Sequence, residues 1–359
     1  MPKIAFYAPM KPPTHSIPSG DRAIACGLLT ALGANTALVS DLRIYDGTGD
    51  ITLQSELINQ ADTEAQRLIQ QGRAEDWKLW FTYHNYYKAP DLIGPKVSKA
   101  LNIPYVLLEA TRAKKRLDGP WAKFAKYAED ACDHADAIFY FTKQDRQALE
   151  TYCYGNQQII HLSPFLATTK TTNPRIKPAN NVLLSVGMLR KGAKSKSYAL
   201  IARTLSTIKT RNWHLNIIGD GAARGDIETL FTQFGDRVTF LGQLDKALIA
   251  DHYTQSSALF WPGVDEAFGM VYLEAQAAGL PVVAQDRPGL RDIIAASTHL
   301  SFAGDITGMA DEIDQLLNNT KHWQNCSRTG IKHIKQNHLL KTAKETLMRT
   351  FTPLIGSSI

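Results

Sequence analysis

Short apolar runs alternate with amphipathic stretches along the first half of the chain. Two of those stretches, 55–71 and 121–134, show helical periodicity. Apolar runs of about four to eight residues are typical of strands buried on both faces, and their alternation with helices predicts a parallel sheet. The pattern therefore predicts a doubly wound, Rossmann-like α/β domain. Its predicted strands lie at residues 3–8, 36–40, 80–84, 104–109 and 137–141.

A polar segment at 168–181 separates this half from a second half of the same kind. The segment is rich in Thr, Lys and Pro and has no periodicity, which is typical of a linker. We therefore expect two Rossmann-like domains, at 1–167 and 182–335, with a cleft between them where ligands bind. A final amphipathic stretch at 330–350 predicts one long helix. The predicted strands of the second domain lie at residues 182–187, 214–219, 238–241, 258–261 and 281–284.

Two glutamates stand out in the strand-loop-helix-strand unit at 258–284. Glu266 lies in the loop before a helix that is predicted to begin near Gly269 and to stop at Gly279, and Glu274 lies inside this helix. The start of a helix attracts phosphate through its unpaired N–H groups and its partial positive charge. With a rise of about 1.5 Å per residue, Glu274 lies roughly 7 to 8 Å from that start. A diphosphate bound there could place a sugar against Glu266 and a ribose beside Glu274.

The full pattern is more specific than either glutamate alone. It reads Glu-x7-Glu, with Phe-Gly-Met inside and Glu-Ala-Gln-Ala-Ala-Gly-Leu-Pro-Val-Val from Glu274 onward. This pattern resembles the retaining glycosyltransferases of family 4, which have the GT-B fold. The resemblance implies two Rossmann-like domains that face each other across a cleft, and a C-terminal helix, 336–359, that returns to the first domain.

The resemblance also implies a donor and the residues that contact it. The donor would be a UDP-, GDP- or ADP-sugar, with no metal ion and no other cofactor. Glu266 would contact the donor sugar and Glu274 the ribose. The loop residues that would contact sugar and phosphates through backbone N–H groups are Ala267, Phe268, Gly269, Met270 and Val271.

Further matches to this family lie earlier in the second domain. Val186-Gly187-Met188-Leu189-Arg190 matches its strand-end basic pair, so Arg190 would stabilise the diphosphate. Lys194 and Lys196 are our candidates for the second cation, with Lys191 open. Gly219-Asp220-Gly221 resembles the turn that lies near the nucleotide base. The candidates for close backbone approach to the diphosphate are Gly20 and Gly187, although each glycine could serve only its own turn.

In the first domain, three polar residues near strand ends are candidates for contact with the acceptor or the sugar: His84, Glu109 and Arg112. The family's histidine often follows a later strand than the one that His84 ends, so the roles of His84, Glu109 and Arg112 stay open. The Gly20 loop lacks the G-x-G-x-x-G spacing, which counts against a nicotinamide cofactor. Acceptor specificity in such folds depends on loops; here these are 9–22, 85–90 and 112–121.

Composition and charge limit the classes of ligand and the cellular location that we expect for this protein. The 359 residues are 44% hydrophobic and carry a net charge of +6, which suits an anionic ligand but is too mild to indicate nucleic acid. We expect a cytoplasmic protein, because the chain has neither a long apolar run nor a start shaped like a signal peptide. Peripheral contact with an acidic membrane surface stays open, as does the acceptor: a glycan, a lipid-linked molecule or a small molecule.

The cysteines predict neither a disulfide scaffold nor a metal site. Cys26, Cys132, Cys153 and Cys326 are scattered, form no C-x-x-C pair and have no accompanying histidine spacing, so we expect free thiols.

The leading hypothesis is therefore a retaining glycosyltransferase that acts by a front-face mechanism, in which the departing phosphate oxygen takes the acceptor's proton. Two alternatives stay open: a sugar-nucleotide epimerase of GT-B fold, and a non-catalytic sugar-nucleotide binding or scaffold protein. Hydrolysis is not favoured, because no tight pair of carboxylates flanking a sugar is evident.

Overall fold

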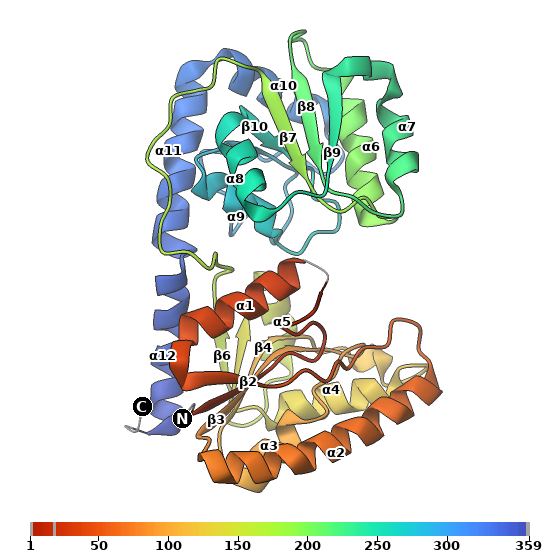
Figure 1. Cartoon of the computed structure of the whole chain (residues 1–359), viewed down its shortest axis with the longest axis vertical. Coiled ribbons are helices and arrows are strands. Elements are labelled where there is room, and N and C mark those ends of the chain that lie inside the picture. Colours follow the sequence, from red (N-terminus) through yellow and green to blue (C-terminus); the bar gives the residue numbers. More distant parts are fainter. Residues whose placement is uncertain (1–2, 17–18, 357–359) are drawn as a thin grey trace. The chain divides into compact units, whose positions relative to one another are not determined.

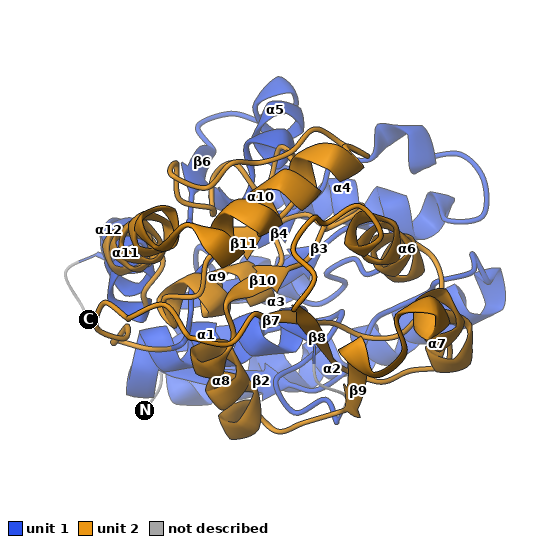
Figure 2. Cartoon of the chain, turned by 90° about the horizontal axis from the view of Figure 1, so that it is seen from above, with its two compact units in different colours: residues 1–167, 340–359 blue, residues 168–339 orange. Residues whose placement is uncertain are grey.

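The chain folds into two compact units. Figure 1 shows the computed structural model, which describes residues 3–16 and 19–356. Unit 1 comprises residues 1–167 and 340–359, and unit 2 comprises residues 168–339 (Figure 2). The polar segment 168–181 groups with unit 2. None of the helices in the described part of the chain is both long and apolar enough to cross a lipid bilayer.

Unit 1 is built on a six-stranded parallel sheet with the order β2-β1-β3-β4-β5-β6. The strands are β1 (Ile4–Tyr7), β2 (Thr36–Ser40), β3 (Leu79–Asn85), β4 (Tyr105–Ala110), β5 (Ala137–Tyr140) and β6 (Gln158–His161). The chain moves outward from β1 to β2 and then continues on the other side of β1, so the strand order reverses between β1 and β3. In sheets of this kind, ligands bind beyond the carboxyl ends of the strands at such a reversal.

Helices cover both faces of this sheet, which explains why its strands read as continuous apolar runs. Consecutive residues of β3 point to opposite faces. Trp80 belongs to the hydrophobic core that is shared with α2, α3 and α4, whereas the ring of Phe81 lies 5.2 Å from that of Phe351 in α12. The helices of unit 1 are α1 (Gly20–Leu32), α2 (Ile51–Glu75), α3 (Gly94–Leu101), α4 (Ala122–His134), α5 (Lys143–Thr151) and α12 (Leu340–Ile355).

Unit 2 contains a five-stranded parallel sheet with the order β11-β10-β7-β8-β9. Its strands are β7 (Val182–Val186), β8 (His214–Ile218), β9 (Val238–Gly242), β10 (Ala258–Phe260) and β11 (Val282–Val283). The strand order reverses between β7 and β10. The loops that follow these two strands carry Arg190 and Glu266, so the topology brings the two predicted charged segments to the same edge of the sheet.

The helix of the two-glutamate unit forms where the sequence predicts it. The N-cap of α9 is Gly269, and its C-cap, Ala278, immediately precedes Gly279. The helices of unit 2 are α6 (Ala193–Leu205), α7 (Arg224–Phe231), α8 (Lys246–Gln255), α9 (Met270–Ala277), α10 (Ile306–Asn318) and α11 (Thr320–Asn337).

The final stretch forms two helices, so the expectation of a single helix over 330–350 is wrong. Helix α11 ends at Asn337, and α12 begins at Leu340. Ile334 is buried in unit 2, whereas Leu347 is buried in unit 1. The two-residue break barely disturbs the apolar periodicity, which is why the sequence pattern does not reveal it.

Candidate active site

Glu266 is the centre of a charged cluster at the carboxyl ends of β7 and β10. Its Oε1 atom pairs with Nζ of Lys194 and accepts a hydrogen bond of 3.3 Å from Nε1 of Trp261. Lys194 Nζ also lies 5.0 Å from the centroid of the Trp261 ring. The side chains of Lys194 and Glu266 are each only 17% exposed. The carboxylate of Glu266 is therefore held by two side chains. Its charge is balanced by Lys194, which follows β7, whereas Glu266 itself follows β10.

The remaining basic candidates lie on the surface of the same region. Arg190, Lys191 and Lys196 are exposed. The loop closes into α6 through the N–H of Ser195, which donates to the carbonyl oxygen of Arg190 at 3.1 Å. Within residues 3–16 and 19–356, no ion pair engages the guanidinium of Arg190. Arg190 thus remains available to bind an anion, whereas Lys194 already serves Glu266.

A hollow of about 360 Å³ adjoins this cluster within unit 2. Lys196 lines it, together with Val264, Gln285 and Arg287. Lys196 therefore faces a different space from the Lys194–Glu266 pair, and the structure separates the two lysines that the sequence treats alike.

The loop between β10 and α9 is fixed by internal contacts. The N–H of Val264 donates to Oγ of Ser197 at 3.0 Å, and the hydroxyl of Tyr272 donates to the carbonyl oxygen of Trp261 at 2.9 Å. Gly269 has φ of +73°, a conformation that favours glycine. This turn leads into the first N–H groups of α9, which have no acceptor inside the helix and suit an anion.

The five predicted loop residues differ in burial. Ala267 is exposed, Phe268 is buried, and Gly269, Met270 and Val271 are partly buried. Backbone N–H contacts with a phosphate would therefore come from Gly269, Met270 and Val271, where the loop becomes the first turn of α9.

Glu274 lies on α9 and is oriented by a residue that sequence reasoning missed. The hydroxyl of Tyr253, in α8, donates a hydrogen bond of 2.9 Å to Oε2 of Glu274. Burial raises the pKa of Glu274, against the opposing effects of this hydrogen bond and of the positive charge of Lys246. Tyr253 lies 21 residues before Glu274, and no spacing rule links two residues on different helices.

The Gly-Asp-Gly turn supports the ends of β7 and β8. Gly219 has φ of +140°, and a Cβ atom on it would lie 1.9 Å from the carbonyl oxygen of Gly187. Position 219 therefore requires glycine for the close approach of the two strand ends. The side chain of Asp220 is exposed and engaged locally, because Oδ1 accepts from the N–H of Gly221 at 2.7 Å and Oδ2 lies 3.2 Å from Nη1 of Arg224.

Unit 1 has its own cluster, at the reversal of its strand order. His84 lies in β3 between two carboxylates: its Nε2 is 3.7 Å from Oδ1 of Asp21, and its Nδ1 is 3.5 Å from Oε2 of Glu109. These separations are too long for strong hydrogen bonds. In the part of the chain that the structure describes, His84 Nε2 and Glu109 Oε2 are buried atoms without a hydrogen-bond partner. Buried polar atoms left in this way require an explanation, and a ligand supplies one.

The backbone at this cluster is strained. His84 has φ of +73° and Glu109 has φ of +59°, although neither is glycine. A residue held in this region costs on the order of 1–3 kcal/mol, and such residues concentrate at functional sites. Because β3 and β4 are neighbours, the two strained residues lie side by side in the sheet. Strain and unpaired atoms thus coincide at one point.

The charges of this cluster are coupled. Burial disfavours the charged imidazole of His84, but the negative charges of Glu109 and Asp21 outweigh burial and raise the pKa of His84. Burial raises the pKa of Glu109 to about 7, although the charge of His84 opposes it. Burial alone would raise the pKa of Asp21, but the hydrogen bond and charge of the neighbouring His84 hold this pKa below its ordinary value. Protonation of the His84–Glu109 pair therefore changes near neutral pH.

Asp21 is the member of this cluster that sequence reasoning missed. The N-cap Ser19 starts α1 by accepting the N–H of Arg22 on its Oγ at 3.2 Å, and Asp21 occupies the first turn. The sequence did contain a signal for Asp21, because an acidic residue directly follows Gly20 of the predicted ligand loop. Gly20 itself is exposed and is the first residue of α1. Residues 17 and 18 of the predicted loop lie outside the described residues.

Arg112 is buried and engaged inside unit 1, whereas the sequence made it a candidate for contact with the acceptor or the sugar. Its buried guanidinium donates from Nη1 to Oε2 of Glu129 at 3.0 Å and to Oδ1 of Asp133 at 2.5 Å. Its Nη2 donates to the carbonyl oxygen of Tyr152 at 2.9 Å. Arg112 thus ties the loop after β4 to α4. Arg112 begins the basic run Arg112-Ala113-Lys114-Lys115-Arg116, and the sequence of this run does not show which member turns inward.

The other end of this basic run meets aromatic rings. The guanidinium of Arg116 lies 4.9 Å from the ring centroid of Tyr87 and 5.7 Å from that of Trp121. Lys88 Nζ lies 5.3 Å from the Trp121 ring. We call Tyr87, Lys88, Arg116 and Trp121 the aromatic-basic cluster. It joins two of the three loops on which acceptor specificity is expected to depend.

Comparison with known proteins identifies the domain that holds the Glu266 site. Residues 180–319 match the family profile described as Glycosyl transferases group 1. The chain carries a glycosyl transferases group 1 domain. This domain includes Arg190, Lys194, Glu266 and Glu274, so the cluster described above lies inside the segment that is characteristic of the family.

Curated relatives match parts of this chain. Phosphatidyl-myo-inositol mannosyltransferase of Mycobacterium leprae (strain TN) is 39% identical over 102 residues, which cover 27% of each chain. N-acetyl-alpha-D-glucosaminyl L-malate synthase of Bacillus anthracis is 29% identical over 147 residues, which cover 40% of this chain and 37% of the synthase. The similarity thus spans well under half of either relative.

Solved structures match over nearly the whole length. Sucrose-phosphate synthase from Thermosynechococcus elongatus has a TM-score of 0.73 at 17% identity and covers 100% of both chains. Anabaena HepE, in complex with UDP, has a TM-score of 0.72 at 15% identity and covers 97% of this chain and 99% of its own. At such identities the likeness concerns the fold. The predicted GT-B fold, with two Rossmann-like parallel sheets, is confirmed.

Proposed function

We propose that this protein is a retaining glycosyltransferase, which moves a sugar from a nucleotide diphosphate-sugar to an acceptor hydroxyl without a metal ion in the reaction. The observation that carries the proposal is the Glu266 cluster. Glu266 is paired with Lys194 and hydrogen-bonded by Trp261 at the strand-order reversal of a glycosyl transferases group 1 domain, directly before the start of α9.

The donor fits the residues around α9. The diphosphate would bind at the N–H groups of Met270 and Val271, with the exposed Arg190 beside it. The ribose would bind to Glu274, whose Oε1 remains for a hydroxyl while Oε2 is held by Tyr253. HepE has been solved with UDP-glucose, and GDP-mannose-dependent mannosyltransferases are among the curated relatives, which supports this donor class and leaves its base open to UDP, GDP or ADP.

The reaction would need charge stabilisation and one proton transfer. As the bond from the sugar to the diphosphate breaks, negative charge grows on the leaving phosphate, and Arg190 and Lys194 would stabilise it. The departing phosphate oxygen would take the acceptor's proton while the acceptor oxygen bonds to the same face of the sugar. Glu266, already neutralised by Lys194, would hold sugar hydroxyls rather than attack the sugar carbon.

The acceptor would be bound by unit 1. Asp21, His84 and Glu109 offer carboxylates and an imidazole that bind hydroxyl groups. The aromatic-basic cluster offers ring faces for a sugar and cations for an anionic group. We therefore propose a hydroxyl-bearing acceptor, such as a glycan, a lipid-linked molecule or a small molecule, with the cluster favouring one that carries negative charge.

Donor binding tests the proposal directly. In a thermal-shift screen with UDP, GDP, ADP and their sugar conjugates in EDTA, one nucleotide class should raise the melting temperature by several degrees. Incubation of that donor with an acceptor library should then release free nucleotide. Absence of any shift would contradict the donor site, and binding without release would favour the scaffold alternative.

Replacing Glu274 by alanine should weaken binding of the nucleotide about tenfold or more, because a hydrogen bond to a charged group contributes about 1.5–3 kcal/mol. Isothermal titration calorimetry with the nucleotide identified by the screen measures the change. Asp251→Ala, an exposed carboxylate on α8 of the same unit, is the matched control and should bind normally. Equal affinity of Glu274→Ala and wild type would remove the ribose role of Glu274.

The pH dependence of kcat/KM for the acceptor should report the ionisation of Glu109. Because burial raises its pKa to about 7, Glu109 is mostly protonated at pH 6 and becomes a carboxylate above pH 7. If the carboxylate holds the acceptor hydroxyl, kcat/KM for the acceptor should rise as pH increases through about 7. Glu109→Gln should lower kcat/KM at pH 8 and abolish this rise. Glu150→Gln, an exposed residue of α5, should keep the profile of the wild type, and an unchanged profile in Glu109→Gln would assign the step to another group.

A further inference from the structure

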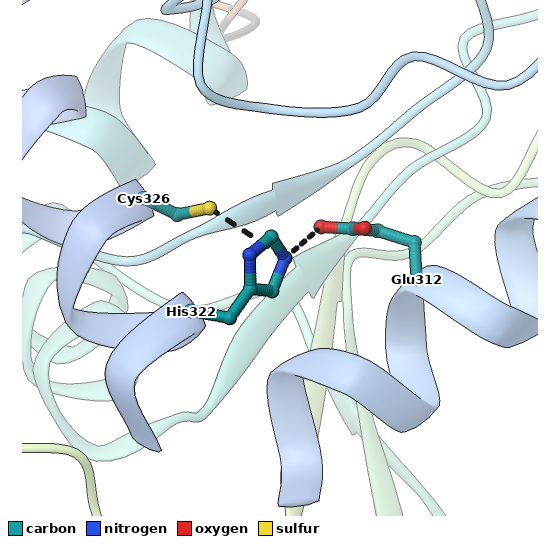
Figure 3. Close-up of side chains that lie close together, drawn as sticks. All are labelled: Glu312, His322 and Cys326. Atoms are coloured by element: carbon teal, nitrogen blue, oxygen red, sulfur yellow. Dashed lines mark hydrogen bonds and ion pairs between the residues drawn. The ribbon is translucent and has the colours of Figure 1, made fainter. Parts of the chain in front are cut away.

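Glu312, His322 and Cys326 form a cluster in unit 2 that has no part in the proposed reaction (Figure 3). His322 and Cys326 lie one turn apart on α11, so their side chains share one face of the helix, and Glu312 reaches them from α10. The sequence-based expectation that no histidine spacing accompanies the cysteines is therefore wrong at Cys326. The third residue comes from another helix, which is why no motif was visible.

The three potential ligand atoms converge on one point. Nε2 of His322 lies 2.9 Å from Oε1 of Glu312 and 3.8 Å from Sγ of Cys326. All three atoms lie within 4.8 Å of one another. Zinc bonds of about 2.0–2.2 Å to nitrogen and oxygen and about 2.3 Å to sulfur, at tetrahedral angles, place N and O roughly 3.3 Å apart and N and S roughly 3.6 Å apart. Side-chain shifts of a few tenths of an ångström would therefore accommodate the ion.

Nε2 of His322 faces both the carboxylate of Glu312 and the thiol of Cys326, as expected if all three groups bind one ion. Without a metal, Nε2 of a neutral His322 can donate to the carboxylate, and the thiol of Cys326 donates to the carbonyl oxygen of Ser297 at 3.5 Å. Zinc would displace both hydrogens and leave an imidazole nitrogen, a carboxylate and a thiolate directed at the same ion. Cys326 is 3% exposed and Glu312 7%, whereas the His322 side chain is 26% exposed and gives the ion a path from solvent.

We propose that Glu312, His322 and Cys326 bind a zinc ion that links α10 to α11. One carboxylate, one imidazole and one thiolate suit zinc better than magnesium or calcium, which prefer oxygen ligands. Three protein ligands leave a fourth position for water. Helix α10 packs on α6, which follows the Arg190 loop, and α11 packs on α9, which carries Glu274. By linking α10 to α11, the ion would therefore support both α6 and α9. Its role would be to stabilise unit 2, outside the proposed sugar-transfer reaction.

Cobalt is a spectroscopic probe for this site, because a Co²⁺–thiolate bond gives an absorption band that oxygen and nitrogen ligands do not give. The full chain, stripped with a chelator and dialysed, is titrated with Co²⁺ and then with Zn²⁺. One Co²⁺ per chain should produce the band, and Zn²⁺ should abolish it. Cys326→Ser should lack the band, whereas Cys153→Ser, which removes the exposed thiol of the loop before β6, should retain it.

A second measurement does not depend on Cys326. Zn²⁺ should raise the melting temperature of the stripped wild type by several degrees, and Mg²⁺ should not. His322→Gln, a partly exposed position, should fold and should reduce Zn²⁺ affinity at least tenfold. A thiolate band that survives in Cys326→Ser, a wild type without the band, or equal Zn²⁺ affinity in His322→Gln would overturn the proposal. None of these outcomes depends on turnover, so they are separable from failure of the proposed transferase function.

Discussion

Arg190→Ala is expected to lower kcat by about 10²–10³, with little change in folding, because removal of one group that stabilises developing charge typically costs that much. Arg190 follows β7 at the strand-order reversal, is exposed, and precedes the loop that closes into α6. Lys194 alone should not compensate for the loss of Arg190, because Glu266 already shares the charge of Lys194. Steady-state kinetics with saturating donor, followed by nucleotide release, measure the loss.

Two further variants make this result specific. Arg211→Ala removes an exposed arginine of the same unit that precedes β8, at the opposite edge of the sheet, and should leave kcat unchanged. Arg190→Lys keeps the charge without the bidentate geometry and should restore part of the rate. A near-normal rate in Arg190→Ala would make Arg190 an ordinary surface residue and would leave Lys194 as the only cation assigned to the diphosphate.

Arg112→Ala is expected to reduce the free energy of unfolding by about 3–5 kcal/mol, because removing one partner of a buried ion pair leaves the other charge buried and unpaired. The side chains of Arg112 and Glu129 are 1% and 8% exposed. The variant also removes the hydrogen bond to the carbonyl oxygen of Tyr152. Urea unfolding monitored by tryptophan fluorescence measures the change.

The control for this prediction is an arginine–carboxylate pair on the surface of the same unit. Arg146 pairs with Glu150 on α5, and both residues are exposed. Arg146→Ala should leave the free energy of unfolding nearly unchanged, because solvent screens an exposed ion pair. Nucleotide affinity of folded Arg112→Ala should equal that of the wild type, since the proposed donor residues belong to unit 2. A loss of acceptor affinity without a loss of stability would restore the ligand-binding interpretation of Arg112.

The sequence determined the features that depend on local pattern. Continuous apolar runs predicted the inner strands, such as β3 and β4, because these strands are buried on both faces. Gly269 and Gly279 predicted the start and stop of α9, since a turn at φ of +73° favours glycine and a helix often ends before one. The position of Glu274 inside α9, shortly after the helix start, follows from helix geometry, whereas the donor class was implied by the family resemblance and stays a prediction.

Tertiary structure decided everything that depends on partners distant in the chain. Which cation lies beside Glu266, which tyrosine orients Glu274 and which arginine turns inward were settled by packing between elements. The break before Leu340 and the joining of Glu312 to His322 and Cys326 likewise involve segments that no local period connects. The physical reason is the same in each case: periodicity records which face of an element is buried, but not the neighbour against which that face is buried.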